Sequence, residues 1–301
     1  MENILILGID GFSGMNFQYF IKQNKLYEKY VFIGADLKIT KLLEIKYLKA
    51  DLLDFDTLSE IIKSEKPDYI INFAGILKES AGSNIIAINS EITRNIFRII
   101  VESKLPVKNT LLIGSAAEYG IPDKLPVSES FPLLPVNLYG LSKVIQYEYT
   151  LFYARANKIK FNMARTFNLT GKGQSSLLSV GKFLEIIKKA NNGDIITVGN
   201  LNTWRDFTDI NDAVSAYWKM LINGSPGEVY NVCSGKPVQM REILKTMVKL
   251  SGKSLRISES IGSPSINDVL KIYGDNTKIK RDLGWEPEID ISESLKRLFG
   301  T

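Results

Sequence analysis

Apolar runs of strand length recur along the first half of the chain, and longer amphipathic stretches separate them. The runs lie at residues 3–7, 30–35, 47–50, 69–73, 110–113 and 161–165. The helix-like stretches end near residue 24 or span residues 54–64, 84–103 and 142–156. A wholly apolar strand is typical of a parallel sheet that is covered on both faces. The alternation therefore predicts an α/β fold with a doubly wound parallel sheet.

The carboxyl ends of these strands are the expected place for a ligand, because doubly wound sheets bind in the crevice outside that edge. The residues at these strand ends are therefore candidate binding residues, and they include Gly8, Asp36, Asp51, Ala74 and Ser115.

A glycine-rich turn follows the first strand, with Gly8, Gly11 and Gly14 around Phe12 and Ser13. Glycine lets the backbone turn sharply and approach a pyrophosphate, whose charge is stabilised at the N-terminus of the following helix. The spacing is G-x-x-G-x-x-G rather than G-x-G-x-x-G, and a glycine turn can also be purely structural. With the strand before it and the helix after it, the turn predicts a Rossmann-type dinucleotide site.

Asp36 ends the second predicted strand. A carboxylate at this place accepts hydrogen bonds from both ribose hydroxyls and repels a 2′-phosphate. The alternative is a plain turn residue at a strand end, and Lys38 and Lys41 follow closely enough to offset the repulsion. We expect ribose binding, and hence NAD(H) in preference to NADP(H).

Tyr139 and Lys143 are four residues apart at the start of the helical stretch 142–156, so they lie one turn apart on one face. A phenol has a pKa near 10, and a neighbouring ammonium favours the phenolate and lowers that value. The pair then forms a proton donor and acceptor suited to carbonyl reduction or alcohol oxidation. A half-buried tyrosine beside a solvated lysine is the alternative that the spacing alone leaves open.

Composition narrows the chemistry. The 301 residues contain no histidine, which excludes histidine triads and histidine metal sites, and we expect no metal. The single cysteine, Cys233, fits a reducing cytoplasm, and Met1 leads so directly into the first strand that we expect no signal peptide. No apolar run is long enough to span a membrane. The net charge of +5 comes from scattered residues without a basic-aromatic cluster, so no nucleic-acid partner is expected.

The motifs together resemble the extended short-chain dehydrogenases/reductases (the NAD-dependent epimerase/dehydratase family) that act on nucleotide sugars, and the resemblance covers the full chain. Within that family the chain is most similar to the reductases of GDP-4-dehydro-6-deoxy-D-mannose, a sister group of the GDP-mannose 4,6-dehydratases. The resemblance implies a catalytic triad of Ser115, Tyr139 and Lys143. It implies cofactor contacts from Gly8, Gly11, Phe12, Ser13, Gly14, Asp36, Asp51, Leu52, Phe73, Ala74, Gly75, Asn89, Tyr139, Lys143 and Thr166.

The second half carries the substrate part of the resemblance. It implies a dinucleotide-binding domain at residues 1–167, to which about 206–233 return, and a smaller C-terminal α/β lobe for the nucleotide sugar at residues 168–301. Substrate contacts are implied for Ser115, Asn168, Gln174, Lys182 and Arg205. Where these reductases commonly have Arg-Pro, this chain has Ser265-Ile266. The identity of the nucleotide base and the residues that bind the substrate diphosphate therefore stay open. Lys182 or Lys271 are candidates to compensate.

The expected activity is NAD(P)H-dependent reduction of the C4 keto group of a nucleotide-linked 4-keto-6-deoxy sugar, most nearly GDP-4-dehydro-6-deoxy-D-mannose to GDP-D-rhamnose. A nucleotide-sugar C4 epimerase with tightly held NAD and a non-catalytic NAD-binding scaffold protein are the alternatives. Dehydration is not expected, because Ala116 and Ala117 stand where the sister dehydratases carry an acid. Glu118 comes one position later, and its side chain is expected to turn away. The oligomeric state stays open, and a homodimer is compatible with the resemblance.

Overall fold

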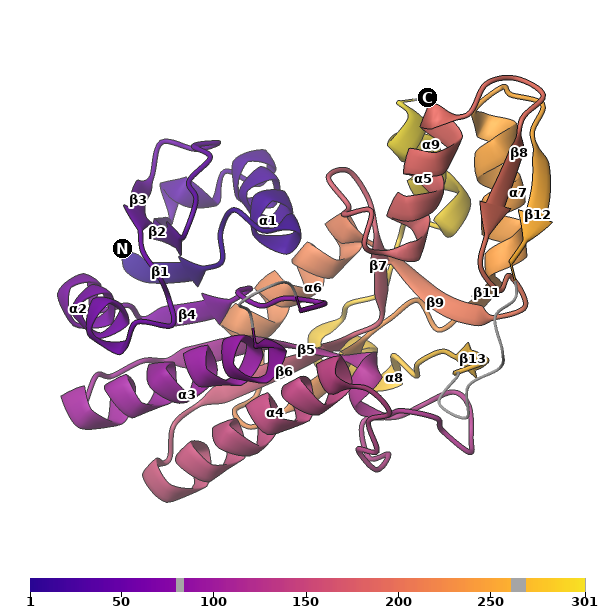
Figure 1. Ribbon diagram of the computed structural model, residues 1–301. Coiled ribbons are helices and arrows are strands. Elements are labelled where there is room, and N and C mark those ends of the chain that lie inside the picture. Colours follow the sequence, from indigo (N-terminus) through magenta and orange to yellow (C-terminus); the bar gives the residue numbers. More distant parts are fainter. Residues whose placement is uncertain (80–83, 261–268, 301) are drawn as a thin grey trace.

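The computed structural model describes residues 1–79, 84–260 and 269–300. Its main element is a parallel sheet with the strand order β10-β6-β5-β4-β1-β2-β3. The strands are β1 (Glu2–Leu7), β2 (Tyr30–Asp36), β3 (Lys46–Lys49), β4 (Tyr69–Asn72), β5 (Asn109–Ser115), β6 (Phe161–Thr166) and β10 (Val229–Val232). The predicted doubly wound sheet is confirmed (Figure 1).

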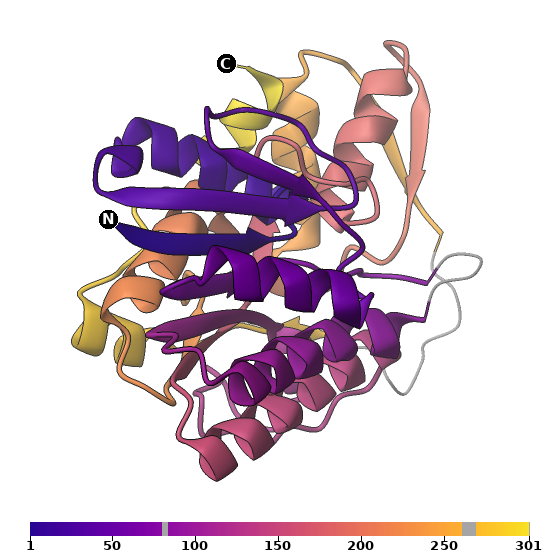
Figure 2. The same cartoon turned by 90° about the vertical axis from the view of Figure 1, so that its left-hand side faces the viewer.

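Two hydrophobic cores lie on the two faces of this sheet. In β1, Ile4 and Ile6 face the core beneath α1 and α6, whereas Leu5 and Leu7 face the core beneath α2 and α3. Every side chain of the strand's centre is thus buried, which is why the sequence there is wholly apolar. The flanking helices are α1 (Phe12–Gln23), α2 (Phe55–Glu65), α3 (Ile85–Ser103), α4 (Leu138–Asn157) and α6 (Ile210–Asn223). Figure 2 shows the sheet between the two helix layers.

A smaller lobe contains shorter strands. One sheet combines β7 (Asn168–Thr170), β9 (Trp204–Asp209), β11 (Pro237–Gln239) and β13 (Lys271–Ile272). A two-stranded sheet pairs β8 (Ile195–Val198) with β12 (Arg256–Glu259). Three helices, α5 (Ser179–Lys189), α7 (Met240–Leu250) and α9 (Ile291–Phe299), share a separate core with β8, β9, β11 and β12. The lobe lies beyond the carboxyl ends of the main strands (Figure 1).

The boundaries between the two parts differ from the sequence-based expectation. The predicted return at about residue 206 starts instead at α6, because β9 pairs within the small sheet. Helix α8 (Thr277–Leu283) and Trp285, which the expectation places in the lobe, also pack against the main core through Ile279 and the indole ring. The chain therefore crosses between the two parts more often than the sequence indicates.

The buried carboxylate of Asp206 joins β9 to the end of the main sheet. It accepts hydrogen bonds from the backbone amides of Ser234, Gly235 and Gly274 and from the Ser234 hydroxyl, at 2.6–3.2 Å. The side chain is fully buried, so these donors replace the water that its charge would otherwise need. This joint fixes β9, and with it the neighbouring Arg205, relative to the main domain.

Candidate active site

A cavity of about 1280 Å³ lies between the carboxyl ends of the main strands and the lobe. Its walls come from both parts of the molecule. The main domain contributes the turn before α1, the loop after β4, the end of β5 and the start of α4, and the lobe contributes β7, α5 and β9. The position agrees with the ligand site expected for a doubly wound sheet.

The turn between β1 and α1 has the geometry of an anion site. Gly8 has a φ of +75°, and a Cβ there would lie 2.4 Å from the backbone nitrogen of Ala74. A Cβ on Gly14 would lie 2.3 Å from the Gly8 carbonyl oxygen. Helix α1 starts at Phe12, and its N-cap residue, Gly11, offers no side-chain cap; the first turn also contains no acidic residue. Its first amides are therefore available to a phosphate, and Gly11, Phe12 and Ser13 line the cavity. The turn fits a dinucleotide pyrophosphate.

Asp36 ends β2 next to this turn. Its carboxylate accepts hydrogen bonds from the amides of Asp10, at 2.9 Å, and Leu37, at 2.7 Å. Asp10 turns its own carboxylate outward to the Thr40 amide, at 2.7 Å, and so away from the phosphate site. Asp36 lies outside the cavity walls proper. Its role in ribose binding stays a prediction.

The other predicted cofactor residues divide into two groups. Phe73, Gly75 and Thr166 line the cavity. Asn89 is fully buried next to Gly75. Its side chain accepts a hydrogen bond from the Ile76 amide at 2.7 Å and donates to the Ile76 carbonyl and the Ser142 hydroxyl, both at 2.9 Å. Asn89 therefore supports the loop after β4 instead of facing the cavity. The remaining predicted residues, Gly8, Gly14, Asp51, Leu52 and Ala74, are not among the residues that line the cavity.

Helix α4 begins earlier than its sequence indicates. It starts at Leu138 instead of Ser142, because the Asn137 side chain caps it by accepting the Gly140 amide at 2.8 Å. Tyr139 therefore lies in the first turn of the helix. Gly140 allows the helix to approach the end of β5, since a Cβ there would lie 2.4 Å from the Ala117 carbonyl oxygen. This approach brings the Tyr139 hydroxyl to the Ser115 side chain, its hydrogen-bond partner.

The expected effect of Lys143 on Tyr139 is wrong in this structure. Burial raises the pKa of Tyr139 to about 12, opposed by the hydrogen bond with Ser115 and reinforced by the negative charge of Glu118. The Lys143 ammonium instead donates to the Ile113 carbonyl at 2.9 Å and to the Gln146 side chain at 3.0 Å. The ammonium is thus directed to these two oxygens, and the spacing of one helical turn between Tyr139 and Lys143 does not by itself lower the pKa of the tyrosine. Burial lowers the pKa of Lys143 to about 8.

Ser115, Tyr139 and Lys143 nevertheless line one cavity, as the sequence predicts. Ala116 and Ala117 line the same wall. The Glu118 side chain points away from the cavity, as predicted, but the reason differs: residues Ala116–Glu118 form a 3₁₀ turn, and the carboxylate folds back to the Ser115 amide at 2.6 Å.

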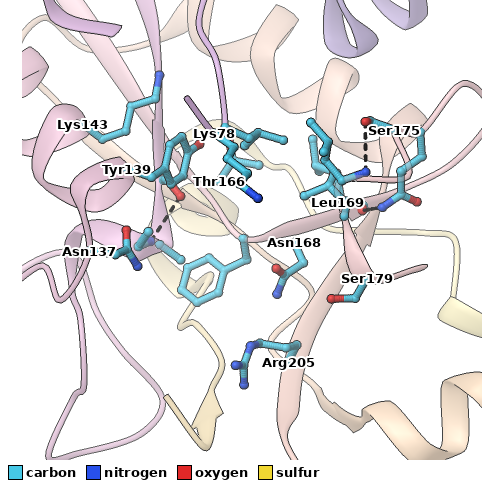
Figure 3. Close-up of a pocket in the computed structure, with 18 of the residues that line it drawn as sticks. Lys78, Asn137, Tyr139, Lys143, Thr166, Asn168, Leu169, Ser175, Ser179 and Arg205 are labelled. Carbon is cyan, nitrogen blue, oxygen red and sulfur yellow. Dashed lines mark hydrogen bonds between the residues drawn. The ribbon is translucent and has the colours of Figure 1, made fainter. Parts of the chain in front are cut away.

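The lobe side of the cavity contains polar and positively charged side chains among apolar ones such as Leu178 and Phe183. The predicted substrate residues Asn168, Gln174, Lys182 and Arg205 line this side of the cavity, and their contacts with a substrate stay a prediction. Figure 3 shows the guanidinium of Arg205 across the cavity from Tyr139. Arg205 donates to the Trp204 carbonyl at 2.8 Å. Lys271 is not in the walls and lies over the Tyr273 ring, 5.5 Å from its centre. Ser265 and Ile266 lie outside the described residues.

Sequence reasoning missed Lys78, Ser175 and Ser179, which also line the cavity (Figure 3). Lys78 follows Gly75 in the loop after β4, and its place just beyond a strand end could have marked it as a candidate binding residue. In the described part of the chain, no group of His, Cys, Asp or Glu side chains is arranged to hold a metal ion. Among the same residues, no helix has the length and apolar character needed to cross a membrane.

Several known proteins are similar to this chain over most of its length. Residues 5–298 match the family described as GDP-mannose 4,6 dehydratase. The GDP-6-deoxy-D-mannose reductase of Pseudomonas aeruginosa is 26% identical in an alignment of 309 positions, which covers 99% of this chain and 96% of that protein. A UDP-glucose 4-epimerase of Lactobacillus helveticus is 27% identical, over 81% of this chain and 79% of that protein.

Solved structures share the fold. RMD from Pseudomonas aeruginosa, complexed with NADPH, has a TM-score of 0.84 at 25% identity, with coverage of 100% of this chain and 98% of that one. The dTDP-glucose 4,6-dehydratase of Bacillus anthracis, in complex with NAD, has a TM-score of 0.87 at 22% identity, with coverage of 100% and 96%. These likenesses confirm the Rossmann-type architecture.

The family match spans nearly the whole chain, and Ser115, Tyr139 and Lys143 line one cavity together with Gly11, Phe12 and Ser13. The chain thus belongs to the GDP-mannose 4,6-dehydratase family and is an NAD(P)-dependent enzyme of the extended short-chain dehydrogenase/reductase type.

Proposed function

We propose that the protein reduces the C4 keto group of a nucleotide-linked 4-keto-6-deoxy sugar, with GDP-4-dehydro-6-deoxy-D-mannose as substrate and GDP-D-rhamnose as product. One observation carries the proposal. The wall that holds Ser115, Tyr139 and Lys143 continues into Ala116 and Ala117, and Glu118 turns away from it. The wall therefore has groups that protonate an alkoxide, but it lacks a carboxyl group beside Ser115 that would remove a carbon-bound proton.

The three side chains divide the reaction between them. A reduced nicotinamide, when bound in this cavity, would supply the hydride for the keto carbon. Ser115 donates a hydrogen bond to the developing oxyanion, and Tyr139 gives that oxygen its phenolic proton. In this proposal the Lys143 ammonium, which the Ile113 carbonyl and the Gln146 side chain hold in place, would bind the nicotinamide ribose. A tyrosine pKa near 12 keeps the phenol protonated at neutral pH, as a proton donor must be.

The cations of the cavity support an anionic substrate. Lys78, Lys182 and Arg205 line the walls, and a nucleotide diphosphate carries the opposite charge. Asn168 lies between Tyr139 and Arg205 in Figure 3, and in this proposal it binds sugar hydroxyls. Lys182 takes over the second phosphate contact in this proposal, since Lys271 lies outside the walls.

NADH is the proposed cofactor, although a similar solved structure holds NADPH. The reason is the Asp36 carboxylate at the end of β2, which would face a 2′-phosphate. We expect a higher kcat/KM with NADH than with NADPH, and a smaller difference in the Asp36→Ala variant. Lys41→Ala serves as a control for the general effect of charge near this loop. A clear preference for NADPH in the wild-type protein would overturn the assignment.

C4 epimerisation is the second candidate, favoured by the similarity to a UDP-glucose 4-epimerase. An epimerase oxidises and re-reduces with the same triad, so it returns its NAD unchanged. The decisive experiment incubates the protein with GDP-4-dehydro-6-deoxy-D-mannose and NADH. Reductase activity consumes NADH and yields a product heavier by two hydrogens. Unchanged NADH together with isomerisation of a nucleotide hexose would favour the epimerase.

Two further properties, the oligomeric state and the location of the protein, stay untested. The sequence predicts a cytoplasmic location, which cell fractionation tests. It leaves the oligomeric state open, and sedimentation would show whether the protein forms a homodimer. A scaffold protein without catalysis is disfavoured because the catalytic Tyr and Lys are both present and line the cavity.

A further inference from the structure

A buried ion pair lies directly behind the Ser115 wall. The Glu118 carboxylate and the Arg165 guanidinium are 2.8 Å apart, and their side chains are only 0% and 3% exposed. Glu118 belongs to the turn after β5, and Arg165 to the neighbouring strand β6. Removing two charges from water is costly, so a buried pair is weak evidence for stability. Because the pair lies next to Ser115, its role is better sought in the position of that residue.

The same carboxylate binds the backbone of Ser115. One Glu118 oxygen accepts the Ser115 amide at 2.6 Å, and the other accepts Nε of Arg165. The Ser115 hydroxyl in turn accepts the Ala117 amide at 3.2 Å, which completes a capping box around the turn. Gly114 leaves room for this arrangement, since a Cβ there would lie 2.5 Å from the Glu118 carboxylate.

Arg165 is itself held on several sides. Its guanidinium lies between the rings of Tyr119 and Tyr147, 5.1 and 4.9 Å from their centres. It also donates to the Glu129 carbonyl at 3.2 Å. The carboxylate of Glu118 thus has a fixed partner on one side and holds Ser115 on the other.

We propose that Glu118 and Arg165 are positioning residues that hold the Ser115 backbone so that its hydroxyl meets Tyr139 and the reacting oxygen. Neither residue touches the substrate, because both carboxylate oxygens are engaged within the protein and neither side chain lines the cavity. The kinetic part of this inference rests on the proposed reductase function. The structural part, a fixed Ser115 amide, does not.

The test compares two double variants that differ only in the acceptor offered to the Ser115 amide. Arg165→Met with Glu118→Met removes both charges and the acceptor. Arg165→Met with Glu118→Gln removes both charges but keeps a carbonyl oxygen in reach of the amide. Replacing both members of a buried pair avoids an unpaired buried charge, so both variants are expected to fold. Both are also made in a Ser115→Ala background.

The first readout is independent of turnover. Hydrogen exchange of the Ser115 amide, followed by NMR, is expected to be slow in the wild type and in the Gln/Met variant, and at least about tenfold faster in the Met/Met variant. Equal exchange in all three proteins would overturn the inference, whatever the activity.

The second readout is kinetic. We expect the Met/Met variant to lose about 10- to 100-fold in kcat, as for a small displacement of a catalytic group, with the KM and the NADH dissociation constant within about threefold of wild type. The Gln/Met variant should recover most of this loss. In the Ser115→Ala background the Met/Met change should have no further effect on kcat. An equal loss in both backgrounds would mean a merely structural role and would overturn the proposal.

The two readouts also separate this inference from the proposed function. If the exchange pattern holds but no nucleotide-linked ketone is reduced by the wild-type protein, the proposed function fails and the positioning of Ser115 stands. If reduction occurs but exchange and kcat are insensitive to the acceptor at residue 118, the positioning role fails and the reductase stands.

Discussion

Burial acts in opposite directions on the two titratable residues of the candidate site. It raises the pKa of Tyr139 to about 12 and lowers the pKa of Lys143 to about 8, because a low-dielectric environment disfavours the charged form of each. The phenol is therefore protonated at neutral pH, and the ammonium is close to losing its charge. Each shift leads to a separate prediction.

Tyr139→Phe removes the phenolic proton and leaves the ring in place. We expect kcat for reduction to fall by at least about 100-fold, since general acids contribute roughly that much, while NADH binding stays within about twofold. Loss of NADH absorbance and a fluorescence titration measure the two effects. Tyr149→Phe, on the same helix but outside the cavity walls, is the matched control and should behave as wild type. A Tyr139→Phe variant that kept more than about a tenth of kcat would refute the assignment.

The pH dependence should report Lys143. Its pKa in the folded protein is lowered to about 8, so the ammonium is present below that pH and is lost above it. Since the proposed role needs the positive charge, kcat/KM for reduction should fall as the pH rises through about 8. A profile between about pH 6 and 10 measures this, with Lys143→Arg as the variant that keeps its charge throughout. The same fall in the Arg variant would assign the titration to another group.

At the scale of elements, the approach of two chain segments depends on single glycines and caps. The turn between β1 and α1 packs against the loop after β4 at Gly8 and Ala74. Helix α4 reaches the end of β5 because Asn137 starts it early and Gly140 carries no side chain. These contacts, more than the strands themselves, bring the turn and the triad to one cavity.

Gly8→Ala and Gly11→Ala form a matched pair that tests this point. At Gly8 the φ of +75° and a Cβ 2.4 Å from the Ala74 nitrogen should lower the free energy of unfolding by about 3 kcal/mol or more. Gly11 has a φ of −71°, and its Cβ would meet only the Gly8 carbonyl oxygen at 3.4 Å, so about 1 kcal/mol or less is expected there. Urea unfolding measures both. Equal losses would contradict the structural role assigned to Gly8.

For the whole molecule, the fold does not select among the reactions of this family. A dehydratase structure from Bacillus anthracis shares the architecture with a TM-score of 0.87. The chemistry is set by a few side chains on the wall beside Ser115, where this chain has Ala116 and Ala117. Fold and reaction therefore have to be argued separately.

The protein is accordingly not expected to be a 4,6-dehydratase. Dehydration must remove a proton from C5 and expel the C6 hydroxyl, and methyl groups at residues 116 and 117 exchange no protons. Glu118 is bound to Ser115 and Arg165. GDP-mannose incubated with the protein and NAD should yield no 4-keto product by mass spectrometry, with an authentic dehydratase as positive control. Formation of the keto sugar would point to Glu118 as an acid that leaves its ion pair.

Much of the architecture follows from local sequence. Wholly apolar strands, such as β1 with its side chains in two cores, require cover on both faces and so predict the doubly wound sheet. The glycine turn and the one-turn spacing of Tyr139 and Lys143 are local patterns too, and both lie at the cavity. Such features are visible in a sequence because they depend on residues within a few positions of each other.

Tertiary structure alone decided the surroundings of these residues. Glu118 and Arg165 are 47 positions apart and meet only because β5 and β6 are neighbours in the sheet. The partners of Lys143 include the Ile113 carbonyl on another element, and the pKa values follow from burial, which spacing does not reveal. Likewise, the packing of the lobe places Lys182 in the cavity and Lys271 outside it. Long-range contacts and solvent exclusion are properties of the folded chain, and they determine how the predicted residues are held and charged.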